Sequence, residues 1–99
     1  MSLGTIQNAL SGIRLAETRK QAEAHNAANM VTEGFKEQEV LAVESPNGVE
    51  SRVRERSRPG HDPVKNAVDS VTTSILYRAN MSVLRAEDEQ TRHTLDLLA

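Results

Sequence analysis

The sequence predicts a mainly α protein, in which two long terminal helices form an antiparallel, coiled-coil-like hairpin with a short β-hairpin or extended loop between them. In both terminal parts of the chain, apolar residues recur at spacings of three and four, the period of a packed helical face. The middle instead carries short alternating runs, a Pro-Asn-Gly turn and a segment rich in proline and glycine. One phenylalanine and one tyrosine are the only aromatic residues, so a thick globular core is not expected.

The N-terminal part, residues 3–33, is predicted to be helical, with its apolar period running from Leu3 to Val31. One face of this helix collects its apolar positions: Leu3, Ile6, Leu10, Ile13, Ala24, Ala27 and Val31. Asn26 and Asn29 point away from the alanines of this face, and their amides are expected to bridge to a second neighbour. The helix is expected to stop before Phe35, with Gly34 free to adopt the positive φ that ends helices or opens turns.

Residues 37–62 are predicted to form a β-hairpin and a linker. The first strand is placed at Val40–Val43, the turn at Pro46-Asn47-Gly48 and the second strand at Val49–Arg56. An isolated two-stranded hairpin is barely stable in water, so we expect this one to lean on the helices or on a neighbouring subunit.

Arginines alternate along the second arm of this hairpin, at Arg52, Arg54, Arg56 and Arg58. Two readings are open for them, a solvated strand face and a stripe that binds phosphate groups. Glu50 and Glu55 dilute the positive charge and few aromatic residues are present for base stacking, so the solvated face is favoured.

The second helix is predicted over residues 63–98, with Asp62 as its N-cap and Pro63 as its first residue. It carries two apolar seams on roughly opposite sides. The first consists of Val64, Val68, Val71, Ile75, Ala79 and Ala86, and the second of Tyr77, Met81, Leu84, Leu95 and Leu98. One antiparallel helix covers only one seam, so self-assembly is the simplest use of the other.

Charges interrupt the seams of both helices, at Glu17 in the first and at Arg78 in the second. If the helices run antiparallel from a common end, these two residues lie at the same height. We therefore predict an ion pair between Glu17 and Arg78, with Lys20 as the next candidate partner for acids of the second helix.

Composition argues against several classes of function. The net charge of −2 favours neither nucleic acid nor anionic lipid, and without cysteine no thiolate metal site exists. His25, His61 and His93 are too far apart in sequence to suggest a metal set, and the chain lacks a phosphate-binding loop and a Gly-x-Ser-x-Gly motif. We expect no catalysis, metal or cofactor. No stretch predicts a membrane span or a cleaved signal peptide, which taken alone indicates a cytoplasmic protein.

The stretch that ends the first helix resembles the N-terminal signature of the bacterial flagellar axial proteins of the rod and hook, about Asn-Asn-Ile-Ala-Asn-x-x-Thr-Pro-Gly-Phe. The matching positions are Asn26, Ala28, Asn29, Thr32, Gly34 and Phe35, whereas His25, Ala27 and Glu33 replace an Asn, the Ile and the Pro. Ala9-Leu10-Ser11-Gly12-Ile13 and Tyr77-Arg78-Ala79-Asn80 resemble the flanking segments of the family. The middle of the chain is much shorter than in most members.

This resemblance implies a short structural protein of the flagellar basal-body rod, a bacterial motility structure. Its terminal helices would pack against each other and against copies of itself and other axial proteins to build a hollow tube. It would reach the periplasmic rod through the flagellum's own export channel without a cleaved signal. Residues expected at subunit contacts are Ile6, Leu10, Ile13, Asn26, Asn29, Val68, Val71, Ile75, Tyr77, Asn80, Met81, Leu84, Leu95 and Leu98, with Gly34 and Phe35 in the turn.

A second reading, from another class, is a stand-alone helical adaptor whose exposed seam receives a helix from an unrelated partner. The two readings differ in self-association. Binding of nucleic acid through the arginine arm is the least supported of the three.

Overall fold

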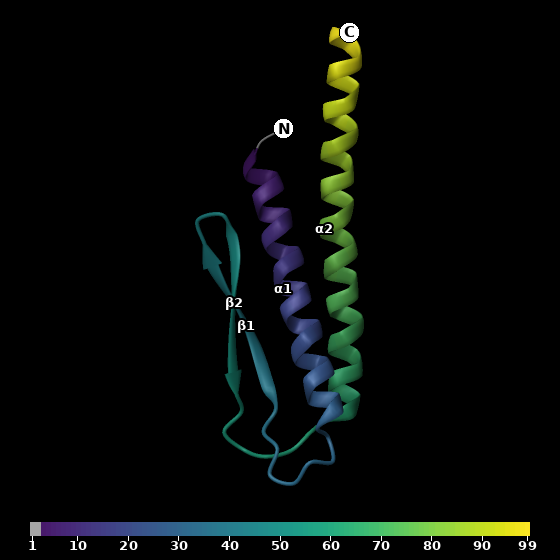
Figure 1. The fold of residues 1–99 in the computed structure, drawn as a ribbon. Helices are drawn as coiled ribbons and strands as arrows, with labels where there is room; N and C mark the ends of the chain where they lie inside the picture. The colour runs from purple at the N-terminus through teal and green to yellow at the C-terminus, as the bar shows by residue number, and fades with distance from the viewer. Residues whose placement is uncertain (1–2) are drawn as a thin grey trace.

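The structure, a computed structural model, describes residues 3–99 as two long helices with an antiparallel β-hairpin between them, which confirms the predicted mainly α class (Figure 1). The elements in chain order are α1 (Leu3–Ala28), β1 (Gln38–Ser45), β2 (Gly48–Glu55) and α2 (Pro63–Leu98). The helices run side by side in opposite directions, and α1 lies between α2 and the hairpin (Figure 1). The molecule is elongated, 63 × 24 × 14 Å.

Helix α1 is covered from two sides, by α2 and by the hairpin. Its buried residues are Ala9, Gly12, Ile13, Leu15, Ala16, Ala22 and Asn26. Of the face predicted from the apolar period, only Ile13 is buried, whereas Ala24 and Ala27 are exposed and Val31 is 88% exposed. The predicted face was wrong at its C-terminal half because a helix with two neighbours buries a wider surface than one seam, and an alanine fits either inside or outside.

The end of α1 also differs from the prediction. The helix stops at Ala28, and residues 29–34 form turns and a bend instead of a further helical turn. The N–H of Thr32 donates to the carbonyl oxygen of Asn29 at 2.9 Å, and this bond between residues three apart closes a tighter turn than the α-helix has. The apolar Met30 and Val31, which suggested one more turn, are left in solvent.

Helix α2 has the predicted bounds and the predicted cap. The side chain of Asp62 accepts a hydrogen bond from the main-chain N–H of Lys65 at 3.0 Å, and Pro63 occupies the first turn, where a missing N–H costs nothing.

Hydrogen bonds between side chains contribute to the contact between the two helices. Thr73 is 2% exposed, and its Oγ1 lies 3.0 Å from Oε2 of Glu23. Nζ of Lys20 donates to the carbonyl oxygen of Ser70 at 2.9 Å and to its hydroxyl at 2.7 Å. These bonds join the C-terminal half of α1 to the N-terminal half of α2.

The predicted pairing of Glu17 with Arg78 is half right. Both residues line one shallow hollow between the helices, together with Ala16 and Tyr77, so the antiparallel register places them at the same level. They form no ion pair, however, among the contacts of residues 3–99. Both side chains are exposed, and water solvates each charge at less cost than fixing two long side chains in one geometry. Lys20, the other candidate, bonds Ser70 rather than an acid.

The hairpin covers nearly the predicted range of residues 37–56, but its first strand, Gln38–Ser45, is longer than the predicted Val40–Val43. Its register pairs Gln38 with Glu55 at the open end and Ser45 with Gly48 at the closed end, so only Pro46 and Asn47 form the turn. It packs against α1, where the N–H of Val49 donates to the hydroxyl of Ser11 at 3.1 Å. The expectation that the hairpin leans on a helix is confirmed.

Candidate functional site

The stretch that carries the flagellar resemblance forms the turn between α1 and β1. Gly34 has a φ of 74°, as expected for a residue that redirects the chain. The N–H of Phe35 donates to the carbonyl oxygen of Thr32 at 3.2 Å, and its own carbonyl accepts from Gly60 at 3.1 Å. The ring of Phe35 lies against that of His25, with centroids 5.4 Å apart. The stretch therefore joins the end of α1, the start of β1 and the linker into one corner.

Asn26 fixes this corner by hydrogen bonds to the main chain of β1. Its Nδ2 donates to the carbonyl oxygen of Gln38 at 3.0 Å, and its Oδ1 accepts from the N–H of Gln38 at 2.9 Å. The residue is 5% exposed, so its amide is already used and is shielded from any second subunit. The expectation that Asn26 reaches a neighbouring subunit is therefore replaced by a role inside the chain. Asn29 is also used locally, since its Nδ2 donates to the carbonyl oxygen of His25 at 2.9 Å.

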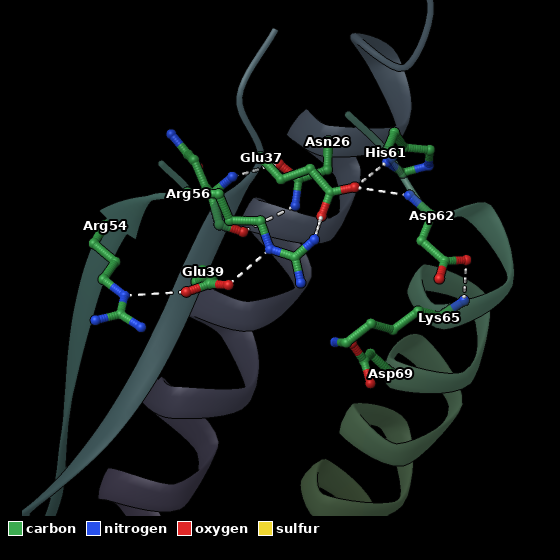
Figure 2. Close-up of polar contacts among 10 residues, drawn as sticks. Asn26, Glu37, Glu39, Arg54, Arg56, His61, Asp62, Lys65 and Asp69 are labelled. Carbon is green, nitrogen blue, oxygen red and sulfur yellow. Dashed lines mark hydrogen bonds and ion pairs between the residues drawn. The ribbon is translucent and has the colours of Figure 1, made fainter. Parts of the chain in front are cut away.

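The carboxylate of Glu37, at the base of the hairpin, accepts one main-chain hydrogen bond and lies close to two basic side chains (Figure 2). Oε1 of Glu37 accepts from the N–H of Asp62 at 3.0 Å and lies 2.8 Å from Nδ1 of His61, a contact that is an ion pair when the ring is protonated. Oε2 lies 3.4 Å from Nη1 of Arg56. Because Asp62 caps α2, Glu37 ties the hairpin to the start of the second helix.

The neighbouring Glu39 binds two of the alternating arginines. Nε of Arg56 lies 2.7 Å from one of its oxygens, and Nε of Arg54 lies 3.0 Å from the other. The hydrogen bonds from Arg56 and then from Arg54 lower the pKa of Glu39, and the bond to Glu39 raises the pKa of Arg56. Two of the four arginines therefore pair with Glu39 inside the hairpin, and Figure 2 shows both contacts.

An apolar stripe on α2 is exposed to solvent. It consists of Val64, Val68, Val71 and Ile75, hereafter the outer stripe, and lies on the side of α2 turned away from α1. Each of the four side chains is more than half exposed, and Val64 is 73% exposed. These four residues form the N-terminal part of the first predicted seam of α2, and α1 does not cover them.

The other residues predicted at subunit contacts fall into three groups. Ile13 is buried, and a second group is half-buried between the helices: Ile6, Asn80, Met81 and Leu84. The rest, Leu10, Tyr77, Leu95 and Leu98, are exposed to differing degrees. Sequence reasoning missed buried Leu15 and Ala22, and it did not single out the exposed Met30 and Leu97.

In the part of the chain that the structure describes, no group of three or more His, Asp or Glu side chains is placed to hold a metal ion. No helix among residues 3–99 has the length and hydropathy needed to cross a bilayer. No protein-family model matches the sequence, and no curated protein matches it.

Proposed function

We propose that the protein is a non-enzymatic structural component of the bacterial flagellar basal-body rod, which assembles with copies of itself and with other axial proteins through its terminal helices. The observation that carries the proposal is the outer stripe. Because residues 24–36 resemble the axial-protein signature, we identify the assembly as the flagellar rod. The proposed location of the protein is therefore the periplasmic rod.

The spacing of the outer stripe suits a coiled-coil-like contact with another helix. Val64, Val68, Val71 and Ile75 are separated by four, three and four residues, the a and d positions of a heptad repeat. All four are β-branched, and such residues at these positions lose little side-chain entropy when packed. A contiguous apolar surface of this kind is typical of interaction sites.

The residues on either side of the outer stripe favour α2 of a second copy as the helix that binds there. Lys65, beside the stripe, is neutralised by Asp69 at 2.6 Å, and Ala67, Thr72 and Ser74 carry no charge. Between Val64 and Ile75, two such surfaces can approach each other without like-charge repulsion, which would otherwise oppose a homotypic contact.

The corner built by the signature stretch supports the same reading. A subunit that is repeated many times needs a fixed angle between its helices and its hairpin. That angle is held by the buried amide of Asn26, by the left-handed turn at Gly34 and by the carboxylate of Glu37, which accepts a hydrogen bond from Asp62.

Sedimentation velocity over a range of concentrations tests self-association through the outer stripe. We expect the protein to form oligomers that the double variant Val68→Glu/Ile75→Glu loses. Val53→Glu is the matched control, since Val53 is 52% exposed on β2 and lies away from the stripe. Equal loss in the control, or a monomer at every concentration of the unchanged protein, argues against the proposed contact.

The rod assignment is tested in the source organism. An immunoblot of purified basal bodies is expected to detect the protein, and deletion of its gene is expected to reduce motility. Its absence from basal bodies would refute the assignment.

A stand-alone helical adaptor is the second candidate, because an exposed apolar stripe at helical spacing can also bind a helix of an unrelated protein. A protein that stays monomeric, and whose outer stripe is protected from amide hydrogen exchange only when a helix of another protein is added, would favour this candidate.

A further inference from the structure

We propose that two copies of this chain pair along the free edge of β1, so that their hairpins form one four-stranded antiparallel sheet. The partner strand is β1 of the second copy. The inference rests neither on the rod assignment nor on the outer stripe, because it uses a different surface of the molecule and bonds between main-chain groups.

The free edge of β1 is the row of main-chain groups that point away from β2. In an antiparallel ladder, alternate residues turn their N–H and C=O groups towards the neighbouring strand, and the residues between them turn these groups outward. The carbonyl oxygen of Glu37 accepts from the N–H of Arg56, which follows β2. The N–H and C=O of Gln38 instead bond the side chain of Asn26, so Gln38 points outward. By the same alternation, the later residues of the free edge are Val40, Ala42 and Glu44.

The free edge is open to an approaching strand. No hydrogen bond within residues 3–99 reaches the outward main-chain groups of Val40, Ala42 and Glu44. Near the turn of the hairpin, the outer edge of β2 faces α1, since the N–H of Val49 donates to the hydroxyl of Ser11. The two edges of a two-stranded ribbon point in opposite directions, so the free edge of β1 there points away from α1. Helix α2 lies on the far side of α1 (Figure 1).

The side chains of β1 do not protect its free edge. Natural proteins protect such edges with charged side chains, prolines or bulges. Residues 40–43 of β1 are valine, leucine, alanine and valine, and the ladder pairs the two strands residue by residue without a bulge. Leu41 is 38% exposed. Charged residues are frequent in β2, at Glu50, Arg52, Arg54 and Glu55. The edge that invites pairing is therefore that of β1.

One register bonds all the outward groups from Val40 to Glu44. When two β1 strands run antiparallel with Ala42 opposite Ala42, Val40 of each copy lies opposite Glu44 of the other, and every such pair exchanges two hydrogen bonds. A shift in one direction places Glu44 opposite Gln38, whose groups are already bonded. The opposite shift places Val40 opposite Pro46, which has no N–H. Each shifted register makes fewer bonds.

The charges of the hairpin permit this register. The two Glu44 carboxylates would be four residues apart along the strands, about 14 Å, which exceeds the screening length of about 8 Å at physiological salt. Glu39 would lie opposite Ser45 of the second copy and is already bonded to two arginines. Glu50 and Glu55 lie on β2, one strand further from the contact. No acid therefore faces an acid between the two copies.

The test places a charge at the centre of the contact, in the background Val68→Glu/Ile75→Glu, in which the outer stripe is disabled. In the dimer, Ala42→Lys sets two lysines directly opposite each other, and Ala42→Glu sets two glutamates there. Ser51→Lys is the matched control, since Ser51 pairs with Ala42 inside the hairpin but lies one strand further from the second copy. Circular dichroism confirms that each variant remains folded.

The stripe-disabled background is expected to form a dimer in sedimentation velocity and nothing larger, because a contact between identical edges is closed. Ala42→Lys and Ala42→Glu alone are each expected to raise the Kd of the dimer by about tenfold or more, since like charges directly opposite each other repel. An equal mixture of the two is expected to regain the dimer, because lysine then faces glutamate. The control is expected to keep it.

Amide hydrogen exchange locates the contact. The N–H groups of Val40, Ala42 and Glu44 are expected to exchange rapidly in the monomeric variants and slowly in the dimer, because only the dimer supplies their acceptors.

Three results would overturn the pairing of β1 edges. They are a stripe-disabled background that is monomeric at every concentration, a mixture of the two charge variants that associates no better than either alone, or a dimer in which these three amides still exchange rapidly. None of these bears on whether the protein is found in basal bodies or associates through the outer stripe, so the two proposals fail separately.

Discussion

Gly12 of α1 lies directly against the side chain of Asn80 of α2. A Cβ placed on Gly12 would be 2.5 Å from Nδ2 and 2.7 Å from Cγ of Asn80, and that Nδ2 is held by a hydrogen bond to the carbonyl oxygen of Leu76 at 2.9 Å. The approach of the two helices at this point therefore depends on the absence of a side chain at Gly12. We expect Gly12→Ala to lower the free energy of unfolding by about 1–3 kcal/mol, the usual cost of overpacking. Urea denaturation measures it.

Asn80→Ala provides the control, because it removes the atoms that the new methyl group would strike. In that background Gly12→Ala is expected to stabilise the protein by up to about 1 kcal/mol, the gain in helix propensity over glycine. The same sign in both backgrounds would show that Asn80 is not the obstacle.

Asn26→Leu is expected to destabilise the single chain by about 2–4 kcal/mol. The substitution leaves the N–H and the carbonyl of Gln38 without the partners they now have, and each unsatisfied buried group costs about 1–3 kcal/mol. Asn29→Leu loses a bond in an exposed turn and is expected to cost about 1 kcal/mol or less. Chemical denaturation of both variants at low protein concentration checks the difference, and equal costs would contradict it.

Gly34→Val is expected to lower the free energy of unfolding by about 1–3 kcal/mol through the backbone alone. A Cβ at this position would meet no atom within 4 Å, so the penalty comes from the φ of 74° and not from a clash. Gly34→Asn is the matched variant, because asparagine tolerates this conformation better. Thermal unfolding should rank the asparagine variant above the valine variant, and the reverse order would exclude backbone strain as the cause.

The bonds from Arg56 and Arg54 make Glu39 a source of acid sensitivity. Its pKa is lower in the folded protein than in the unfolded chain, so its contribution to stability is complete above the unfolded pKa of about 4.3 and is lost as the pH falls through the folded value. We expect Glu39→Gln to be less stable than the unchanged protein at pH 7 and to lose that difference towards pH 3. Urea midpoints across this range measure it, and a constant difference would contradict the assignment.

The sequence predicted α2 to the residue because its signals are local: Asp62 and Pro63 start the helix, and no breaker interrupts it before Leu98. The orientation of α1 was harder to predict. Many of its buried residues are alanines, and an alanine is buried only where a neighbouring element covers it. The apolar period of α1 did not show that the hairpin covers a surface of this helix in addition to the one covered by α2.

Candidate site residues were predictable to the extent that they form a pattern. The outer stripe is part of a seam visible at helical spacing, and Gly34 stands in a turn motif. The role of Asn26 was not predictable, because its partner Gln38 comes within reach only after the turn has reversed the chain. The contact of Glu37 with His61 joins residues from two separate connecting segments and leaves no periodic signal.

The modest core of this subunit has a thermodynamic consequence. Its buried apolar side chains are Ala9, Ile13, Leu15, Ala16 and Ala22, and three of these are alanines. Unfolding a single copy therefore hydrates little hydrocarbon, and its heat-capacity change should fall below the usual value of about 12–15 cal/mol/K per residue. The stability of one copy should vary only gently with temperature. If copies bury their exposed valines and leucines by binding one another, the heat-capacity change of association should be larger than that of folding a single copy. Warming should then strengthen the contacts between copies more than it stabilises the fold of each copy.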